Sequence, residues 1–508
     1  MSRTRVGLGP QACGDASATD PRQVRGVRAD KVSRAADNPG FVNYADRKHP
    51  QRLEKVLEDG SKVAVIGAGP AGSMFSYFFL TMAETVGLEV DVDIFEPRRF
   101  CHRGPAGCNH CGGVVSESLV QRLATEGIML PDSVVQRGID SYTLHMDVGD
   151  VQIAMPLMEK RIAAMYRGNG PRESEPLDTH SFDGYLLDLA EQQGANRIPR
   201  LVTDVHRDAD RMTVVCADQY SDAYDLVVVA SGVNSRLLGI LESESQAFEQ
   251  PGRTKTFICE FRLGREVIRD TFGPSMHVFL LDIPRLEFAA LIPKGEFVTL
   301  CLLGDDIDEA LMDRFFSSPE VRNCFPGGVI PRHACHCFPR INIRAAQPAY
   351  GDRLVMIGDS GSTRLFKDGI GSAYRTAKAA AKTAVFHGVD AENFKLHYAP
   401  VCRKISNDNR VGKLVFSVAG LVQKARFARR GVLRMTACEQ AQAGRPQRMS
   451  EVLWDLFSGS ASYTNVFLRT LHPAYIGSLL WNLLAGNLPG SAARQGQVRG
   501  AEGSHVRH

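Results

Sequence analysis

Apolar and polar positions change period along this chain in a way that separates strands from helices. Two short apolar runs, 63–66 and 90–95, have the length of strands. Between them Phe75, Phe78 and Phe79 recur at helical spacing. A strand, a helix and a second strand in this order predict a parallel βαβ unit at the start of the patterned region.

The alternation continues downstream. Further strands are expected at 201–206, 212–217 and 226–230, a hairpin from 142–146 and 151–155, and helices at 117–123 (capped by Ser116) and 183–193. Residues 245–345 then change character, with strands at 257–261, 277–281, 288–292 and 297–303 and one helix at 307–316. A parallel-type strand returns at 353–357, an alanine-rich helix follows at 372–386, and helical periods continue to about residue 485.

A glycine-rich turn joins the first strand to its helix. It reads Gly67-Ala68-Gly69-Pro70-Ala71-Gly72, and the second strand ends at Glu96. The first glycine permits the tight turn, the second lets the backbone approach a pyrophosphate, and the third lets the helix pack close to the strand. The helix N-terminus favours phosphates, and Glu96 can accept hydrogen bonds from both hydroxyls of a ribose. Because a glycine turn that only packs a helix does not require the acid, the combination predicts a dinucleotide site.

Composition narrows the class of protein. A chain of 508 residues allows two domains plus appendages, and 44% hydrophobic with 23% charged residues is ordinary for a soluble globular protein. The net charge of +3 gives no reason to expect nucleic acid as a partner. We find neither a secretory signal nor a bilayer-spanning stretch, and the twelve cysteines are scattered, so we expect a cytoplasmic protein.

Three segments together carry a resemblance. They are the glycine-rich turn with Glu96, the turn at 231–236, and the late pair formed by Gly358-Asp359 and Gly369-Ile370-Gly371. Their combination resembles the FAD-dependent oxidoreductases of the p-hydroxybenzoate hydroxylase class, and within it the geranylgeranyl reductase family. The Cys111-Gly112-Gly113 loop and the Phe182-Asp183 helix start add to the likeness, which spans roughly residues 61–390.

The resemblance implies a role for each segment. Residues expected to contact FAD are Gly67, Gly69, Pro70, Ala71 and Gly72 at the pyrophosphate, Glu96 and Pro97 at the adenosine ribose, Gly112 and Gly113 near the flavin, Gly358 and Asp359 at the ribityl chain, and Gly369, Ile370 and Gly371 at the pyrimidine edge. Cys111 is expected at the reacting face. Lys367 either adds positive charge beside the flavin or is a solvated loop charge.

The implied architecture is α/β. A discontinuous Rossmann-type FAD-binding domain is expected over 59–244 and 346–390, a mostly antiparallel substrate domain is inserted at 245–345, and a helical C-terminal region covers 391–485. The flanking segments 1–58 and 486–508 are polar or rich in glycine and arginine, and we expect them to be disordered, apart from a short helix within 43–58.

Two positions depart from the family pattern. The central turn usually carries Asp before its glycine, and here Ser231 stands there. The reductases' aromatic motif Tyr-x-Trp-x-Phe-Pro corresponds to 288–293, where only the proline and one aromatic remain. The Trp-x-Trp-x-Ile-Pro pattern of flavin-dependent halogenases is absent from this stretch as well.

Two loops gather cysteine and histidine. One holds Cys101, His102, Cys108, His110 and Cys111, and the other holds His333, Cys335, His336 and Cys337. Three interpretations stay open: a redox dithiol at Cys108 and Cys111, a zinc or iron–sulfur centre shared by both loops, or small residues in tight turns. We assign no metal ligand from the sequence.

Three functions follow from these features. The first is a reductase that delivers hydride from flavin to double bonds of an apolar substrate, such as an isoprenoid, with NAD(P)H or a redox partner protein as electron donor. The second is an FAD monooxygenase. The third is an electron-transfer module with a cysteine-bound metal or a redox dithiol.

The helical end suggests a contact with membranes. Residues 411–434 mix apolar and basic side chains, and the run 475–484 is apolar but too short to span a bilayer. Such helices either lie on an anionic membrane surface or pack on the FAD domain with a solvated basic edge.

Overall fold

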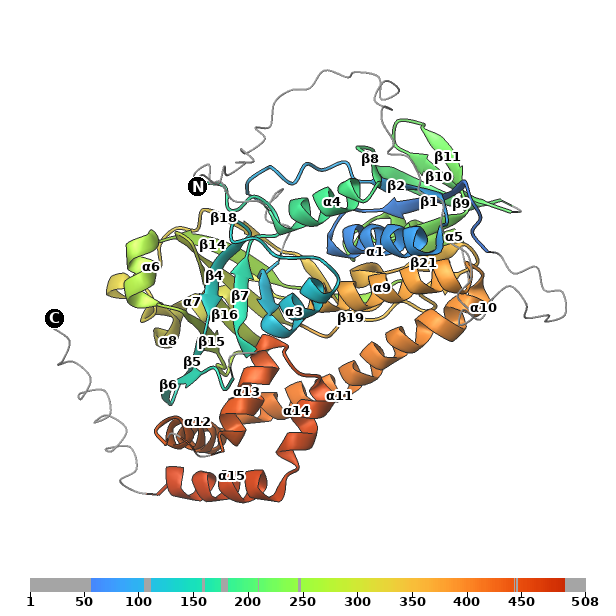
Figure 1. Ribbon diagram of the computed structural model, residues 1–508. Helices are drawn as coiled ribbons and strands as arrows, with labels where there is room; N and C mark the ends of the chain where they lie inside the picture. The colour runs from blue at the N-terminus through green and yellow to red at the C-terminus, as the bar shows by residue number, and fades with distance from the viewer. Residues whose placement is uncertain are drawn as a thin grey trace, which may run out of the picture. The chain divides into compact units, whose positions relative to one another are not determined.

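The computed structural model describes residues 56–104, 111–157, 160–174, 181–208, 210–244, 248–442, 444 and 446–488. The expectations for nearly all of the segment 1–58, for the helix within 43–58 and for the tail after residue 488 therefore lie outside the described residues. Within them, the α/β class and the order of elements expected from the sequence are confirmed (Figure 1).

A six-stranded sheet forms the first half of the molecule. Its strand order is β20 (Tyr350–Gly351), β21 (Leu354–Met356), β12 (Leu226–Val229), β1 (Ser61–Ile66), β2 (Val90–Phe95) and β8 (Asn196–Ile198). All pairs are parallel except β20 with β21. All four residues of β12 are buried, which is typical of a parallel strand covered on both faces.

Helices and a small sheet cover the two faces of this sheet. Helices α1 (Pro70–Val86), α4 (Phe182–Gln192) and α9 (Gly369–Phe386) pack together, with Phe78 edge-on to Tyr374. The antiparallel sheet of β9 (Val202–Arg207), β10 (Met212–Cys216) and β11 (Ser221–Tyr224) leads into β12 through a buried residue, Tyr224, which packs edge-on to Phe95. Helix α5 (Leu237–Glu244) follows the turn after β12.

A seven-stranded, mostly antiparallel sheet forms the second half. Its order is β18 (Cys335–Cys337), β14 (Phe257–Arg262), β17 (Phe297–Gly304), β16 (Leu286–Lys294), β15 (Ser275–Phe279), β5 (Ser141–Met146) and β6 (Gly149–Ala154). The hairpin β5–β6 comes from before residue 245 and joins the inserted strands through a parallel pairing with β15. Residues 245–345 hold more helix than expected: α7 (Glu309–Ser317) was foreseen, whereas α6 (Arg265–Thr271) and α8 (Pro319–Arg322) were not.

Smaller elements connect the two halves. They are the sheet of β3 (Val114–Ser116), β7 (Ile162–Met165) and β4 (Val135–Ile139), the pair β13 (Gly252–Lys255) and β19 (Arg340–Arg344), and helix α3 (Glu117–Thr125). Ser116 is the N-cap residue of α3, as expected, but its hydroxyl pairs with the hydroxyl of Ser118 rather than with the helix backbone.

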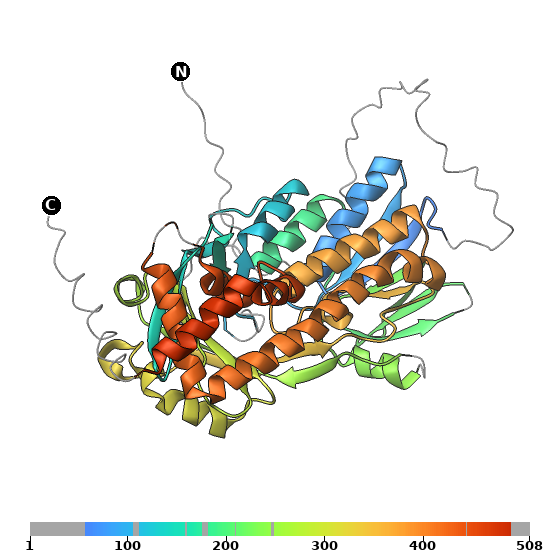
Figure 2. The same ribbon diagram turned by 90° about the horizontal axis from the view of Figure 1, so that it is seen from below.

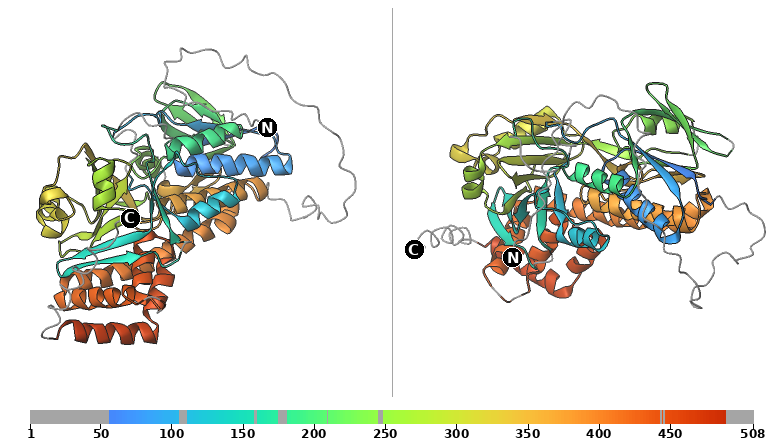
Figure 3. Two further views of the ribbon diagram at one scale, coloured as in Figure 1. Left: turned by 60° about the vertical axis from the view of Figure 1, so that its left-hand side comes forward. Right: turned by 45° about the horizontal axis from the view of Figure 1, so that its top comes forward.

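The C-terminal region is helical, as expected. It contains α10 (Ala391–Asn393), a single π-helical turn at Phe394–Tyr398, α11 (Ala399–Lys424), α12 (Arg426–Gln440), α13 (Arg448–Ser458), α14 (Tyr463–Thr470) and α15 (Pro473–Gly486). Helix α11 runs from α9 to the other C-terminal helices (Figure 2), and α12 and α15 lie side by side (Figure 3).

The sequence suggested a single helix over the basic stretch 411–434, but the structure has two helices there. The backbone of Ala425 is extended, with φ −99° and ψ 104°, so α11 ends at Lys424 and α12 begins at Arg426. The break turns α12 onto β6 and α15, where Leu433 and Val432 are buried. Among the described helices, none combines the length and apolar character needed to cross a bilayer.

Candidate functional site

Four neighbouring parallel strands deliver the predicted site residues to one edge of the sheet. Gly67 follows β1, Glu96 follows β2, the turn at Ser231 follows β12, and Gly358-Asp359 follow β21 after Ile357. Ligands of open α/β sheets bind outside the carboxyl ends of the strands, where connections diverge to opposite faces. The strand order therefore brings these distant motifs to one edge of the sheet.

The turn after β1 admits only glycine at two positions. Gly67 has φ 105°, and a Cβ there would lie 2.7 Å from the Ala230 carbonyl oxygen. A Cβ on Gly72 would lie 1.9 Å from the Gly67 carbonyl oxygen, so the helix can approach the strand only because this atom is missing. No side chain caps α1, whose N-cap is Gly69 and whose first residue is Pro70. Its first N–H groups consequently point at the edge where a phosphate would sit.

Glu96 is buried and oriented by the turn. Its carboxylate accepts a hydrogen bond of 3.2 Å from the Ala68 N–H and bonds of 3.0 Å from both the backbone N–H and the Nε of Arg98. The ion pair with Arg98 leaves the arginine half-exposed, while Glu96 is 2% exposed. The acid is thus fixed beside the glycine turn, in a position to accept hydrogen bonds from a ribose.

A partly buried ion pair that the sequence did not reveal lies next to Gly69. Arg167, after β7, donates Nε to Asp183 Oδ1 at 3.0 Å and Nη2 to Asp183 Oδ2 at 2.7 Å. Burial lowers the pKa of Arg167, but the carboxylate of Asp183 outweighs it and raises that pKa above its usual range. The same Nη2 would lie 3.3 Å from a Cβ on Gly69. A fixed positive charge therefore stands over the glycine turn.

Asp359 follows β21 and lines the site. Burial raises the pKa of its carboxyl, and the charge of Arg167 acts in the opposite direction. Its backbone carbonyl accepts a hydrogen bond of 3.1 Å from Asn342, which ties the turn after β21 to β19. A Cβ on Gly358, whose φ is 57°, would lie 2.7 Å from the Cβ of Ala71, so this turn touches the start of α1.

The N-terminus of α9 faces the same site. The helix begins at Gly369, three residues earlier than expected, with Asp368 as its N-cap in the left-handed region at φ 54°. A Cβ on Gly371 would lie 2.0 Å from Asp368 Oδ1, so the carboxylate folds over the first turn only because Gly371 has no side chain. Arg364 and Arg375 pair with Asp368 at 3.3 and 2.7 Å and neutralise it.

A cavity of about 290 Å³ connects these groups with the seven-stranded sheet. One end is lined by Gly69, Pro70, Gly113, Asp359 and Gly369. The other end is apolar and is lined by Ile258, Met276, Val278, Phe288, Ala290 and Ile292. Phe457 of α13 closes one wall, so the C-terminal helices belong to the site.

Lys367 lies where the two ends of the cavity meet. Its Nζ donates a hydrogen bond to the Leu456 carbonyl and lies 4.5 and 4.3 Å from the ring centroids of Phe288 and Phe457. Burial, and secondarily the charge of Arg364, lower its pKa well below the usual value for lysine. Lys367 is among the residues that line the cavity. The alternative of a solvated loop charge is therefore wrong.

Cys111 is the last cysteine of the first cysteine loop and lines the cavity with Gly112 and Gly113. Its Sγ accepts a hydrogen bond of 3.3 Å from the Gly113 N–H. Gly113 has φ 63°, and a Cβ there would overlap the Met165 carbonyl oxygen at 1.9 Å. Gly113 thus packs against β7, and its N–H fixes the Cys111 thiol.

The described residues of the two cysteine and histidine loops do not assemble into a metal-binding group. His333, Cys335, His336 and Cys337 lie on and before the edge strand β18, whereas Cys111 lines the cavity. Cys108 and His110 fall outside the described residues, so the dithiol and the shared metal centre stay hypotheses.

The residues present fit a bound FAD. Five helix and turn positions described above admit no Cβ, neither α1 nor α9 has a side-chain hydrogen bond at its N-cap, and Arg167 supplies a positive charge. Beside Gly67, the buried Ser231 hydroxyl has no hydrogen-bond partner among the described residues. Arg167 escaped sequence reasoning because its partner Asp183 is 16 residues away, across the loop that follows β7.

The fold, a parallel sheet whose strand ends carry the site and a mostly antiparallel sheet beside it, is shared with solved structures, one of them determined with FAD bound. A geranylgeranyl bacteriochlorophyll reductase-like protein from Thermoplasma acidophilum superposes with TM-score 0.58 at 13% identity, covering 81% of this chain and 99% of that one. A flavoprotein/dehydrogenase from Cytophaga hutchinsonii gives TM-score 0.56 at 17% identity, over 84% and 99% of the two chains.

A halogenase, PltM, belongs to the same group of folds. A variant solved in complex with FAD superposes with TM-score 0.53 at 14% identity, over 86% of this chain and 92% of that one. No family model and no curated protein matches the sequence. The likeness therefore confirms the fold that the motifs indicated, at sequence identities where only the fold is comparable.

Proposed function

We propose that this protein is an FAD-dependent oxidoreductase that reduces double bonds of an apolar substrate. One observation carries the proposal: a single cavity runs from the glycine turn and the N-terminus of α9 to an apolar sheet surface. Gly69, Asp359 and Gly369 at the first end would hold FAD, which would supply the hydride once reduced. The apolar end of the cavity takes the substrate and excludes water from the reacting carbons.

An isoprenoid suits the second end. The side chains that β14, β15 and β16 present there, Ile258, Met276, Val278, Phe288, Ala290 and Ile292, are all apolar. Such a surface offers area but few directional contacts, which suits an unbranched or methyl-branched hydrocarbon chain.

Two residues of the chain are proposed to act on the substrate. Saturation of a double bond needs hydride at one carbon and a proton at the other, and the Cys111 thiol lies in the cavity wall where it can donate that proton. Lys367, held next to Phe288 and Phe457, would take up a proton as negative charge develops on a bound, reduced flavin. NAD(P)H or a redox partner protein is the proposed electron donor.

A single-turnover experiment tests this function. The FAD-loaded protein is reduced without oxygen and mixed with a polyprenol in detergent. We expect reoxidation of the flavin together with a product that is heavier by two hydrogens for each bond reduced. Cys111→Ala is expected to slow reoxidation without loss of flavin, whereas Cys438→Ala, an exposed cysteine on α12, should leave it unchanged.

The behaviour of the reduced protein with oxygen distinguishes a reductase from a monooxygenase. A monooxygenase would leave the polyprenol unreduced under anaerobic conditions and would form hydrogen peroxide or an oxygenated product once air is admitted. Flavin that transfers electrons only to an added redox protein would instead support the electron-transfer module.

A further inference from the structure

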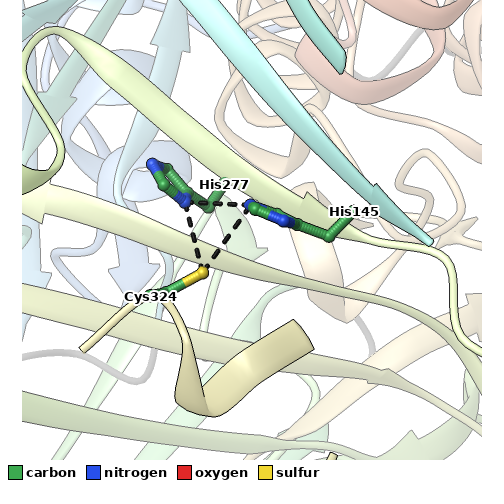
Figure 4. A group of neighbouring side chains, drawn as sticks. All are labelled: His145, His277 and Cys324. Atoms are coloured by element: carbon green, nitrogen blue, oxygen red, sulfur yellow. Dashed lines mark hydrogen bonds between the residues drawn. The ribbon is translucent and has the colours of Figure 1, made fainter. Parts of the chain in front are cut away.

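A buried group of two histidines and one cysteine lies outside the cavity (Figure 4). His145 is on β5, His277 is on β15, and Cys324 follows α8; all three are less than 9% exposed. Strands β5 and β15 are adjacent and parallel, which brings the two rings together at a centroid distance of 5.0 Å. The group thus joins three segments that are far apart in the sequence.

The three donor atoms form a compact triangle. His145 Nε2 lies 3.0 Å from His277 Nδ1, and Cys324 Sγ lies 3.6 Å from the first nitrogen and 3.4 Å from the second. Bonds of about 2.0–2.1 Å to nitrogen and about 2.3 Å to sulfur place tetrahedral ligand atoms about 3.3 Å (N to N) and about 3.6 Å (N to S) apart. The observed triangle matches these separations to about 0.3 Å, and its centre lies about 2 Å from each atom.

The group faces away from the cavity. Met276 and Val278 line the cavity, and since side chains alternate along a strand, His277 points to the opposite face. That face is covered by a helical layer, α6 to α8, whose Phe272 and Phe315 pack on His277 and Phe279. A bond through Cys324 would therefore fasten this layer to the sheet.

We propose that His145, His277 and Cys324 bind one Zn²⁺ ion in a structural site. Two imidazole nitrogens and one thiolate are the donors that Zn²⁺ prefers. Binding forms two Zn–N bonds and one Zn–S bond and releases the thiol proton to solvent. The fourth position is taken by water or by Asp150, which pairs across the hairpin with His145 and whose charge reaches Cys324.

The hydrogen bonds within the group are compatible with replacing the thiol proton by Zn²⁺. Cys324 Sγ also lies 3.3 Å from the Glu320 carbonyl oxygen, to which the thiol donates, and the 3.0 Å contact between the rings needs one proton on one nitrogen. On binding, the thiol proton leaves and the shared imidazole proton moves to the other nitrogen of its ring.

Cobalt substitution tests the proposal. The full-length protein, treated with chelator and dialysed, is titrated with Co²⁺. We expect a thiolate-to-cobalt charge-transfer band and long-wavelength d–d bands that saturate at one ion per chain, and Zn²⁺ should bleach both. Histidine pairs at the surface, such as the stacked His387 and His397, cannot produce the thiolate band.

Matched variants locate the site. Cys324→Ser is expected to lose the charge-transfer band and the rise in thermal unfolding temperature that Zn²⁺ produces, whereas Cys438→Ser keeps both. Folded wild-type protein that takes up Co²⁺ without a thiolate band, or retains no stoichiometric zinc, would overturn the proposal even if Cys324→Ser fails to fold. Equal bands in the two variants would overturn it as well.

Discussion

Three basic side chains around the cavity are each held differently. Arg167 is paired with the buried Asp183 through two hydrogen bonds. Arg364 donates to the carbonyls of Gly459 and Ala461 at 2.9 and 2.6 Å, and so ties the loop before α9 to the C-terminal helices. Lys367 has no salt bridge within the described part of the chain. Burial therefore lowers its pKa, whereas Asp183 raises the pKa of Arg167.

Lys367→Met is expected to flatten the pH dependence of stability. Because burial lowers the pKa of Lys367 in the folded state, the unfolded chain binds more protons between that pKa and about 10.4. The free energy of unfolding therefore rises with pH across this window, and the wild type gains on the order of 1–3 kcal/mol between neutral pH and about pH 10 relative to the variant.

Urea unfolding at neutral pH and at about pH 10 measures this difference in the free energy of unfolding. Lys382→Met, which replaces an exposed lysine of α9, should keep the wild-type slope. Identical slopes for wild type and Lys367→Met would show that Lys367 is charged in the folded protein.

At the scale of elements, the sequence predicted correctly those helices and strands whose structure depends on the local sequence. The glycine turn, its strand and its helix are a local unit, and β1, α1 and β2 lie where the sequence placed them. The break at Ala425 was not foreseen, because no Gly or Pro marks it and because it depends on where α12 packs, against β6 and α15.

Gly72→Ala is expected to destabilise the protein and to weaken flavin binding. The added Cβ would lie 1.9 Å from the Gly67 carbonyl oxygen, so α1 must move away from β1. Overpacking of this kind costs about 1–3 kcal/mol. Thermal unfolding and FAD titration of the purified variant measure both effects.

Gly477→Ala is the matched control in α15, where a Cβ would meet nothing within 4 Å. An added methyl in an open helical position should stabilise by up to about 1 kcal/mol. If both variants shifted stability equally, the close approach at Gly72 would not be what requires glycine.

At the scale of the whole molecule, contacts between distant segments escaped the sequence. His145 and His277 are 132 residues apart and Cys324 is 179 residues from His145, so no spacing marks the group. The β5–β15 pairing that brings the histidines together is likewise non-local. Site residues on strand ends were predictable because strand order in this fold follows from the motifs.

The C-terminal helices also present an apolar surface that the sequence could only suggest. The side chains of Trp481 and Leu484 in α15 are 67% and 70% exposed. Phe427 of α12, the helix that packs beside α15, is 59% exposed. Lys424 and Arg426 are exposed beside Phe427. Apolar and basic side chains together fit the surface of an anionic membrane.

Trp481→Glu with Leu484→Glu is expected to reduce cosedimentation with phosphatidylglycerol vesicles by about tenfold or more, because two apolar anchors are replaced by like charges. Substitutions in α15 are preferable to a deletion of the C-terminal helices, because that deletion would also remove Phe457 of α13, which lines the cavity. Leu201→Glu, at an exposed apolar position outside the helices, should bind like wild type. Unchanged binding of the double variant would exclude this surface.

The visible spectrum of the purified full-length protein tests the central claim most directly. After incubation with FAD and gel filtration, we expect flavin bands at one FAD per chain, and we expect them to bleach without oxygen when NADPH or dithionite is added. A folded protein that retains no flavin at any FAD concentration would contradict the account, because the glycine turn, Glu96 and the N-terminus of α9 would then have no cofactor to hold.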